Sequence, residues 1–106
     1  MTPDRSAEVF AALSDPTRRR LLDHLSRRGP ASATELTDVV PISRQAVAKH
    51  LAVLEEAGLV AGERSGRERR FRLTPAPMSE AMSWMAAVGA DWDERLDALR
   101  RHLRRR

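Results

Sequence analysis

The sequence predicts a mainly α-helical protein with one small β-hairpin, folded as a single domain over residues 1–106. Three observations lead to this prediction. Apolar residues recur at helical spacing in five segments, Pro or Gly residues separate these segments, and residues 59–74 form two runs that can alternate around a Ser65-Gly66 turn. A chain of this length has room for one limited core, so a second copy of the chain would offer a useful additional packing surface.

The charge of the chain is positive and unevenly distributed. The 19 basic and 15 acidic residues give a net charge of +4, and residues 61–74 hold five Arg against two Glu. Because 18 of the basic residues are Arg, a GC-rich genome is an alternative explanation for the bias. The absence of Cys excludes disulfides, thiolate metal sites and a cysteine nucleophile. No apolar run approaches the roughly 20 residues that span a bilayer, and no signal segment is visible, so we expect a cytoplasmic protein without a membrane partner.

Two helices are expected before residue 30. The first covers residues 1–13, with Pro3 early in it. The second follows Asp15, a favourable N-cap residue, and begins at Pro16, where a missing N–H costs nothing. The Gly-Pro pair at 29–30 ends it.

Residues 32–58 have the pattern of a helix-turn-helix. Ser32 and Glu35 have the spacing of a capping box and begin a short third helix through "SATELTDVV". Pro41 interrupts it, and Ser43 is the expected N-cap of a fourth helix. Two short helices with a tight connection are typical of a helix-turn-helix. The inward stripe of the fourth helix consists of Val47, Leu51 and Leu54.

The outer face of the fourth helix is a candidate reader of DNA. Arg44 can bond guanine and Gln45 adenine in a bidentate way, while Ser43 and the helix N-terminus can hold a phosphate. Lys49 lies on the same face, and the small alanines beside it would let the helix approach base edges. An ordinary solvated helix face is the alternative. His50 lies at the edge of the core stripe, either as a partly buried structural residue or as a further DNA contact.

The hairpin at 59–74 is interpreted as a wing beside the helix-turn-helix. Arginine at a hairpin tip suits phosphates and the minor groove. Charged residues also protect strand edges against aggregation, which is the alternative role. The candidate DNA contacts of the wing are Arg64, Arg67, Arg69 and Arg70.

The last helix, expected over residues 77–104, carries an apolar seam with a seven-residue repeat. This seam is long for a helix that packs on so small a body, so we expect it to pack against its equal in a second subunit, together with the helix at 1–13. Packing across its own domain is the alternative. The predicted dimer interface comprises Phe10, Met78, Met82, Met85, Trp92, Leu96, Leu99 and Leu103.

No metal site, cofactor or catalytic site is predicted. One His beside several carboxylates is a thin ligand set, and neither a phosphate-binding loop nor a nucleophile with a base and an orienting group can be assembled. The residues considered for a metal were Asp91, Asp93, Glu94, Asp97 and His102.

The motifs "DPTRRRLL", "SRQAVAKHLAVLEEAGLV" and "SGRERRFRL" together resemble the ArsR-type winged helix-turn-helix repressors over roughly residues 7–75. This resemblance implies a homodimer built from the first and last helices. It also places Ser43, Arg44, Gln45, Lys49 and His50 at recognition-helix positions. Many members sense metals through cysteines in the helix that here reads "TELTDVV", or through paired Asp and His in the last helix. This chain has no Cys and a lone His there, so it is more similar to the metal-independent members.

We therefore expect a sequence-specific DNA-binding transcriptional regulator. The most specific form of this expectation is a dimeric repressor on an inverted-repeat operator in double-stranded DNA, with an effector that the sequence does not identify. Two alternatives use the same fold, namely a protein-interaction module and a nonspecific DNA-binding protein.

Overall fold

The computed structural model describes residues 5–104 and contains five helices and a three-stranded sheet in that range. The helices and strands follow in the order α1 (Arg5–Leu13), α2 (Pro16–Arg28), β1 (Ala31–Ser32), α3 (Ala33–Leu36), α4 (Arg44–Glu56), β2 (Val60–Ser65), β3 (Glu68–Leu73) and α5 (Ala76–Arg104). The predicted fold class is confirmed. The predicted helix start near Pro3 and the last two arginines lie outside the described residues.

Local capping signals fix the ends of the helices. The carboxylate of Asp15 accepts hydrogen bonds from the backbone N–H groups of Thr17 (2.7 Å) and Arg18 (3.2 Å). Ser32 and Glu35 form the expected capping box at α3. Gly58, with φ of +78°, follows the end of α4 in a conformation that favours glycine.

Three details differ from the sequence prediction. The third helix is shorter than expected, because α3 ends at Leu36 and turns occupy residues 37–39. The two-residue strand β1 was not predicted. The last helix begins at Ala76, one residue before the expected start at residue 77, because Pro77 fits within the first turn of a helix.

The sheet is antiparallel with strand order β1-β3-β2. Ala31 of β1 pairs with Phe71 of β3, while Gly62 of β2 pairs with the other side of the same residue. The sheet therefore ties the hairpin to the segment that leads into α3. Helices α1 to α4 enclose the core below it, and its fully buried large side chains are Val9, Leu21, Leu36, Val47, Leu51, Leu54 and Leu59.

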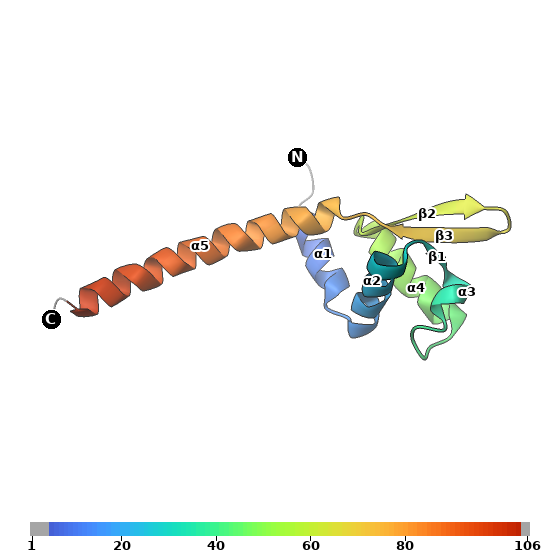
Figure 1. The fold of residues 1–106 in the computed structure, drawn as a ribbon, viewed down its shortest axis with the longest axis horizontal. Coiled ribbons are helices and arrows are strands. Elements are labelled where there is room, and N and C mark those ends of the chain that lie inside the picture. The colour runs from blue at the N-terminus through green and yellow to red at the C-terminus, as the bar shows by residue number, and fades with distance from the viewer. Residues whose placement is uncertain (1–4, 105–106) are drawn as a thin grey trace.

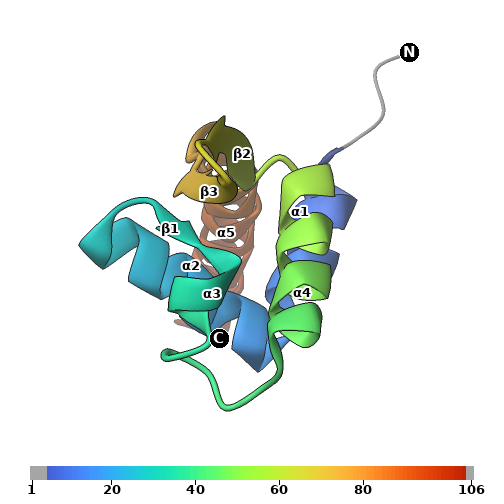
Figure 2. The same cartoon turned by 90° about the vertical axis from the view of Figure 1, so that its right-hand side faces the viewer.

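The molecule is elongated, with principal extents of 70 × 35 × 20 Å. The wing, α3 and α4 lie toward one end, and most of α5 projects away from the other (Figure 1). Seen from the wing end, α5 runs away behind the hairpin, and α3 and α4 lie on the viewer's side of the body (Figure 2). The helix-turn-helix and the wing are thus presented together, at a distance from the exposed part of α5.

Candidate nucleic-acid interface

Helix α4 separates an apolar face from a polar face, as the sequence predicts. Its N-cap Ser43 accepts a hydrogen bond from the N–H of Ala46 at 3.2 Å. The predicted stripe is completely buried. On the opposite face Arg44, Gln45 and Lys49 are exposed, and none of the three pairs with another described residue. Their donors are therefore free to meet an external partner.

The wing carries two arginines that are likewise exposed and unpaired among the described residues. Arg64 and Arg67 are exposed on either side of the turn at Gly66, where φ is +65°. Neither forms a hydrogen bond or an ion pair with any residue that the structure describes. A cation at a hairpin tip without an internal partner is suited to a phosphate.

The other two predicted wing residues have partners inside the chain. Arg69 forms a bidentate ion pair with Glu55 at the end of α4, with distances of 3.1 and 2.7 Å. Arg70 pairs with Glu35 of α3 at 2.5 Å and donates to the carbonyl oxygen of Pro30 at 2.9 Å. Both guanidinium groups connect the wing to the helix-turn-helix, a role that the sequence did not predict.

The pair between Arg70 and Glu35 changes the ionisation of both groups. The hydrogen bond from Arg70 is the largest influence on Glu35, and it holds the pKa of this carboxyl below its ordinary value although burial acts against it. The same hydrogen bond raises the pKa of Arg70. The pair is therefore fully charged at neutral pH.

A groove of about 360 Å³ lies between α4 and the wing. It is lined by the small side chains Ala48 and Ala52 and by Arg44 and Arg67, from the helix and from the wing tip. Glu55 and Glu68 also line it, and they pair with Arg69 and Arg70. Two cationic elements thus face one concave surface, an arrangement that fits the anionic backbone of a nucleic acid.

Comparisons with known proteins agree with this geometry. A family model described as a helix-turn-helix domain matches residues 13–63. The HTH-type transcriptional regulator YuzN of Bacillus subtilis is 42% identical over 80 residues, covering 70% of this chain and 87% of that protein. An ArsR-like transcriptional regulator from Rhodococcus has a solved structure that superposes with a TM-score of 0.79 at 44% identity, covering 90% of this chain and 89% of that chain. The chain belongs to the ArsR family of winged helix-turn-helix transcriptional regulators. The resemblance noted in the sequence is thus confirmed at the level of the family.

Two further similar proteins bear on metal sensing and on dimer formation. A probable mercury resistance operon repressor of Streptomyces lividans is 31% identical and covers 93% of this chain and 78% of that protein. A homodimeric winged helix-turn-helix DNA-binding domain from Mycobacterium bovis, solved by NMR, superposes with a TM-score of 0.63 at 25% identity, covering 88% of this chain and 82% of that chain. The proteins similar to this chain therefore include one named for mercury resistance and one solved as a homodimer.

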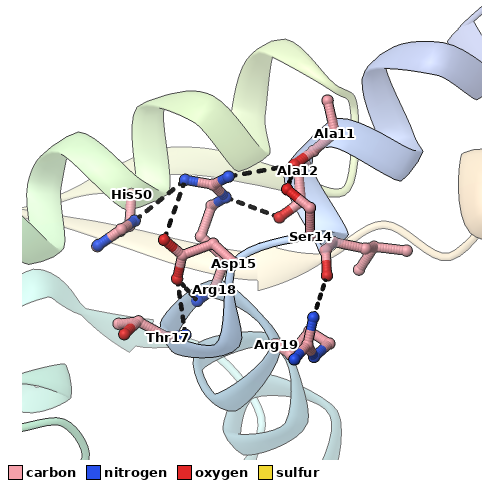
Figure 3. Close-up of polar contacts among 9 residues, drawn as sticks. Ala11, Ala12, Ser14, Asp15, Thr17, Arg18, Arg19 and His50 are labelled. Carbon is pink, nitrogen blue, oxygen red and sulfur yellow. Dashed lines mark hydrogen bonds and ion pairs between the residues drawn. The ribbon is translucent and has the colours of Figure 1, made fainter.

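His50 of this ArsR-family protein lies on α4, between its buried stripe and its exposed polar face. It is half-buried, and its Nδ1 is 3.4 Å from Nη1 of Arg18. Arg18 also donates to the carbonyl oxygens of Ala12 (2.7 Å) and Ala11 (3.2 Å) at the end of α1 (Figure 3). This polar contact agrees with the structural alternative for His50, and DNA contact by His50 stays a prediction.

Asp15 completes this polar network. Burial opposes its ionisation, but the N–H groups of Arg18 and Thr17 and the charges of His50 and Arg18 keep the pKa of this carboxyl below its ordinary value. The network joins α1, α2 and α4 (Figure 3).

The apolar seam of α5 is exposed in the single chain. Met78 packs at the edge of the core, whereas the rest of the seam projects beyond it (Figure 1). Phe10 of α1 contacts Trp84 of α5 with ring centroids 6.0 Å apart, and Trp84 was missed in the sequence because it lies outside the seven-residue repeat. The large exposed residues of α5 are Met82, Trp84, Met85, Trp92, Leu96, Leu99 and Leu103. In the single chain, Met78 is thus the seam residue that packs on the core of its own domain, and the others are exposed.

Metal ligands and membrane-spanning helices were both considered in the fold of the described residues. Residues 5–104 contain no group of three or more His, Asp and Glu side chains placed to hold a metal ion. No helix in the same range is long and apolar enough to cross a membrane.

Proposed function

We propose that the protein is a homodimeric repressor that binds an inverted-repeat operator through α4 and the wing. The observation that carries this proposal is the shared groove, which Arg44 of α4 and Arg67 of the wing both line without a partner among the described residues. A duplex in this position would meet a helix in its major groove and a hairpin beside it.

Each side chain has a distinct role in this proposal. Arg44 and Gln45 read base edges, because their planar donor groups match guanine and adenine. Ser43 and the N-terminus of α4 hold a phosphate, and Lys49 contacts the backbone nearby. His50 keeps the inner edge of the face in place.

The wing contributes charge without reading bases. Arg64 and Arg67 are assigned to phosphates or the minor groove, because both are exposed and unpaired. Arg69 and Arg70 are assigned to attachment of the wing, because carboxylates already occupy their guanidinium groups.

The exposed seam of α5 is the proposed dimer interface, together with Phe10 and Trp84. A contiguous row of large apolar side chains is costly to leave in water and marks an interaction surface. The homodimeric relative from Mycobacterium bovis supports a homodimer for this chain. Two recognition helices related by a two-fold axis would enter successive major grooves about 34 Å apart, so half-sites should be centred about 10 bp apart.

We further propose that this regulator does not sense metals through thiolates and carries out no catalysis. The chain has no Cys at the positions where the resemblance would place thiolate ligands. If a signal releases the operator, it must bind the free and the DNA-bound dimer unequally.

Salt dependence separates DNA binding from a protein-interaction role. Lys49, Arg64 and Arg67 from each subunit give six cations, so the slope of log K against log salt should be about −5 at about −0.9 per neutralised phosphate. The slope can be measured by fluorescence anisotropy with a duplex of about 30 bp. A flat dependence, or no binding at low salt, would contradict the proposal and favour the interaction module.

A further inference from the structure

One carboxylate joins the recognition helix to both strands of the wing. Glu55, in the last turn of α4, accepts two hydrogen bonds from Arg69 of β3, at 3.1 and 2.7 Å. It also accepts one from the backbone N–H of Gly62 in β2, at 3.1 Å. Because β2 is the edge strand of the sheet, this carboxylate takes the place of a neighbouring strand at that point.

Two further features hold the guanidinium of Arg69 in place. It lies over the ring of Phe71, with 5.2 Å between Cζ and the ring centroid. A Cβ atom at Gly62 would come within 2.7 Å of Cζ of Arg69, closer than such atoms approach in proteins. The glycine therefore leaves the space that the guanidinium fills. We call the contacts among Glu55, Gly62, Arg69 and Phe71 the wing latch.

The position of the wing latch determines what it can control. Strand β3 is held by its pairing with β1 and by Arg70, whereas β2 lies at an edge of the sheet and has no second strand beside it. The wing latch ties the middle of both strands back to α4. The tip residue Arg67 and Arg44 of α4 line the same groove.

We propose that Glu55 is a positioning residue for DNA binding, which holds the wing where Arg67 and α4 can engage one duplex at the same time. This inference rests on the proposed function. It makes Arg69 an internal anchor rather than a DNA contact, although the sequence alone groups it with the other wing arginines. Preorganisation of this kind raises affinity because the wing loses less freedom on binding.

The direction in which Glu55→Gln and Arg69→Ala change DNA affinity shows whether Arg69 anchors the wing or contacts DNA. If the wing latch positions the wing, Glu55→Gln and Arg69→Ala should both weaken binding to a duplex selected by the wild-type protein, each by about three- to tenfold. If Arg69 instead contacts a phosphate, Glu55→Gln frees it and strengthens binding to every duplex, while Arg69→Ala flattens the salt slope by about 1 per subunit. Effects of opposite sign would overturn the proposal.

Charge and folding need their own controls. Gly62→Ala displaces the guanidinium without changing any charge, so it should weaken binding like Glu55→Gln. Asp23→Asn removes one negative charge from an exposed ion pair on α2 and should change binding by less than twofold. Thermal melting verifies that each variant is folded.

A double-mutant cycle between Glu55 and Arg67 measures whether Glu55 acts through the wing tip. A general loss of stability would not produce coupling between the two residues. In the wild-type background Arg67→Ala should weaken binding, whereas in the Glu55→Gln background the same change should cost much less, because the tip is no longer held in place. Equal costs in the two backgrounds would show that Glu55 does not act through the wing.

Hydrogen exchange measures the protection of the Gly62 amide in the absence of DNA. It therefore tests the wing latch separately from the proposed function. The Gly62 amide should exchange at least about tenfold faster in Glu55→Ala than in the wild-type protein, with amides of the core helices unchanged. Equal exchange would refute the wing latch. Absence of DNA binding by a wild-type protein that protects this amide would refute only the proposed function.

Discussion

Replacing Leu96 tests whether α5 forms the dimer interface. Leu96 lies in the middle of the exposed seam and is 43% exposed in the single chain. Complete burial of a leucine side chain contributes about 1.5–3 kcal/mol, so burying the remaining fraction contributes about 0.6–1.3 kcal/mol for each copy and twice that for the dimer. Leu96→Ala should therefore raise the dimer dissociation constant by about 10- to 80-fold.

Leu96→Asp should have a larger effect than Leu96→Ala. It removes the same apolar contact and would also place an unpaired carboxylate in the interface, which costs several kcal/mol more at about neutral pH. The expected result is a monomer at micromolar concentrations that retains the helical content of the wild-type protein.

Sedimentation equilibrium measures both dissociation constants directly. Glu94→Ala is the matched control, because Glu94 lies on the same helix but on the side away from the seam. It should leave the dimer intact. A Leu96→Asp variant that sediments as a wild-type dimer would refute the assignment of α5 to the interface.

Three further predictions concern DNA binding and pH. Arg44→Ala or Gln45→Ala should cost about 1–3 kcal/mol on the preferred site and relax its base preference; equal weakening on random DNA would show that the reading face is misassigned. Arg67→Ala should weaken binding to all sequences and flatten the salt slope by about 1 per subunit; an unchanged slope would remove Arg67 from the contacts. Because the folded-state pKa of Glu35 is lowered, its ion pair stabilises the protein above the ordinary pKa near 4.5, and this contribution is lost as pH falls through the folded-state value. Glu35→Gln should therefore lower the melting temperature at about pH 7, and this effect should shrink as pH falls below about 4.5; an effect that does not change with pH would exclude the charge of Glu35 as the cause.

Features set by neighbours in the sequence could be predicted. Asp15, Ser32 and Ser43 cap helices through bonds that span two or three residues, and a short motif identifies such caps. The two faces of α4 follow equally from helical periodicity. The exposed polar face of α4 was therefore predicted from the sequence. Its contacts with DNA stay a prediction.

Features set by distant residues could not be predicted. Strand β1 exists because Ala31 pairs with Phe71. The two residues are far apart in the chain, and the local sequence around either one does not predict this pairing. The partners of Arg69 and Arg70 lie 14 and 35 residues away in the chain, so a row of wing arginines was interpreted as one group. The structure divides it into Arg64 and Arg67, which have no partner among the described residues, and Arg69 and Arg70, which pair with Glu55 and Glu35.

Selection of binding sites from a random duplex pool with the purified protein tests the central claim most directly. The account predicts enrichment of an imperfect inverted repeat with half-sites centred about 10 bp apart, bound by two copies of the chain. Recovery of no consensus at moderate salt, from a protein that still binds DNA, would contradict sequence-specific reading by α4 and leave the wing as a nonspecific clamp.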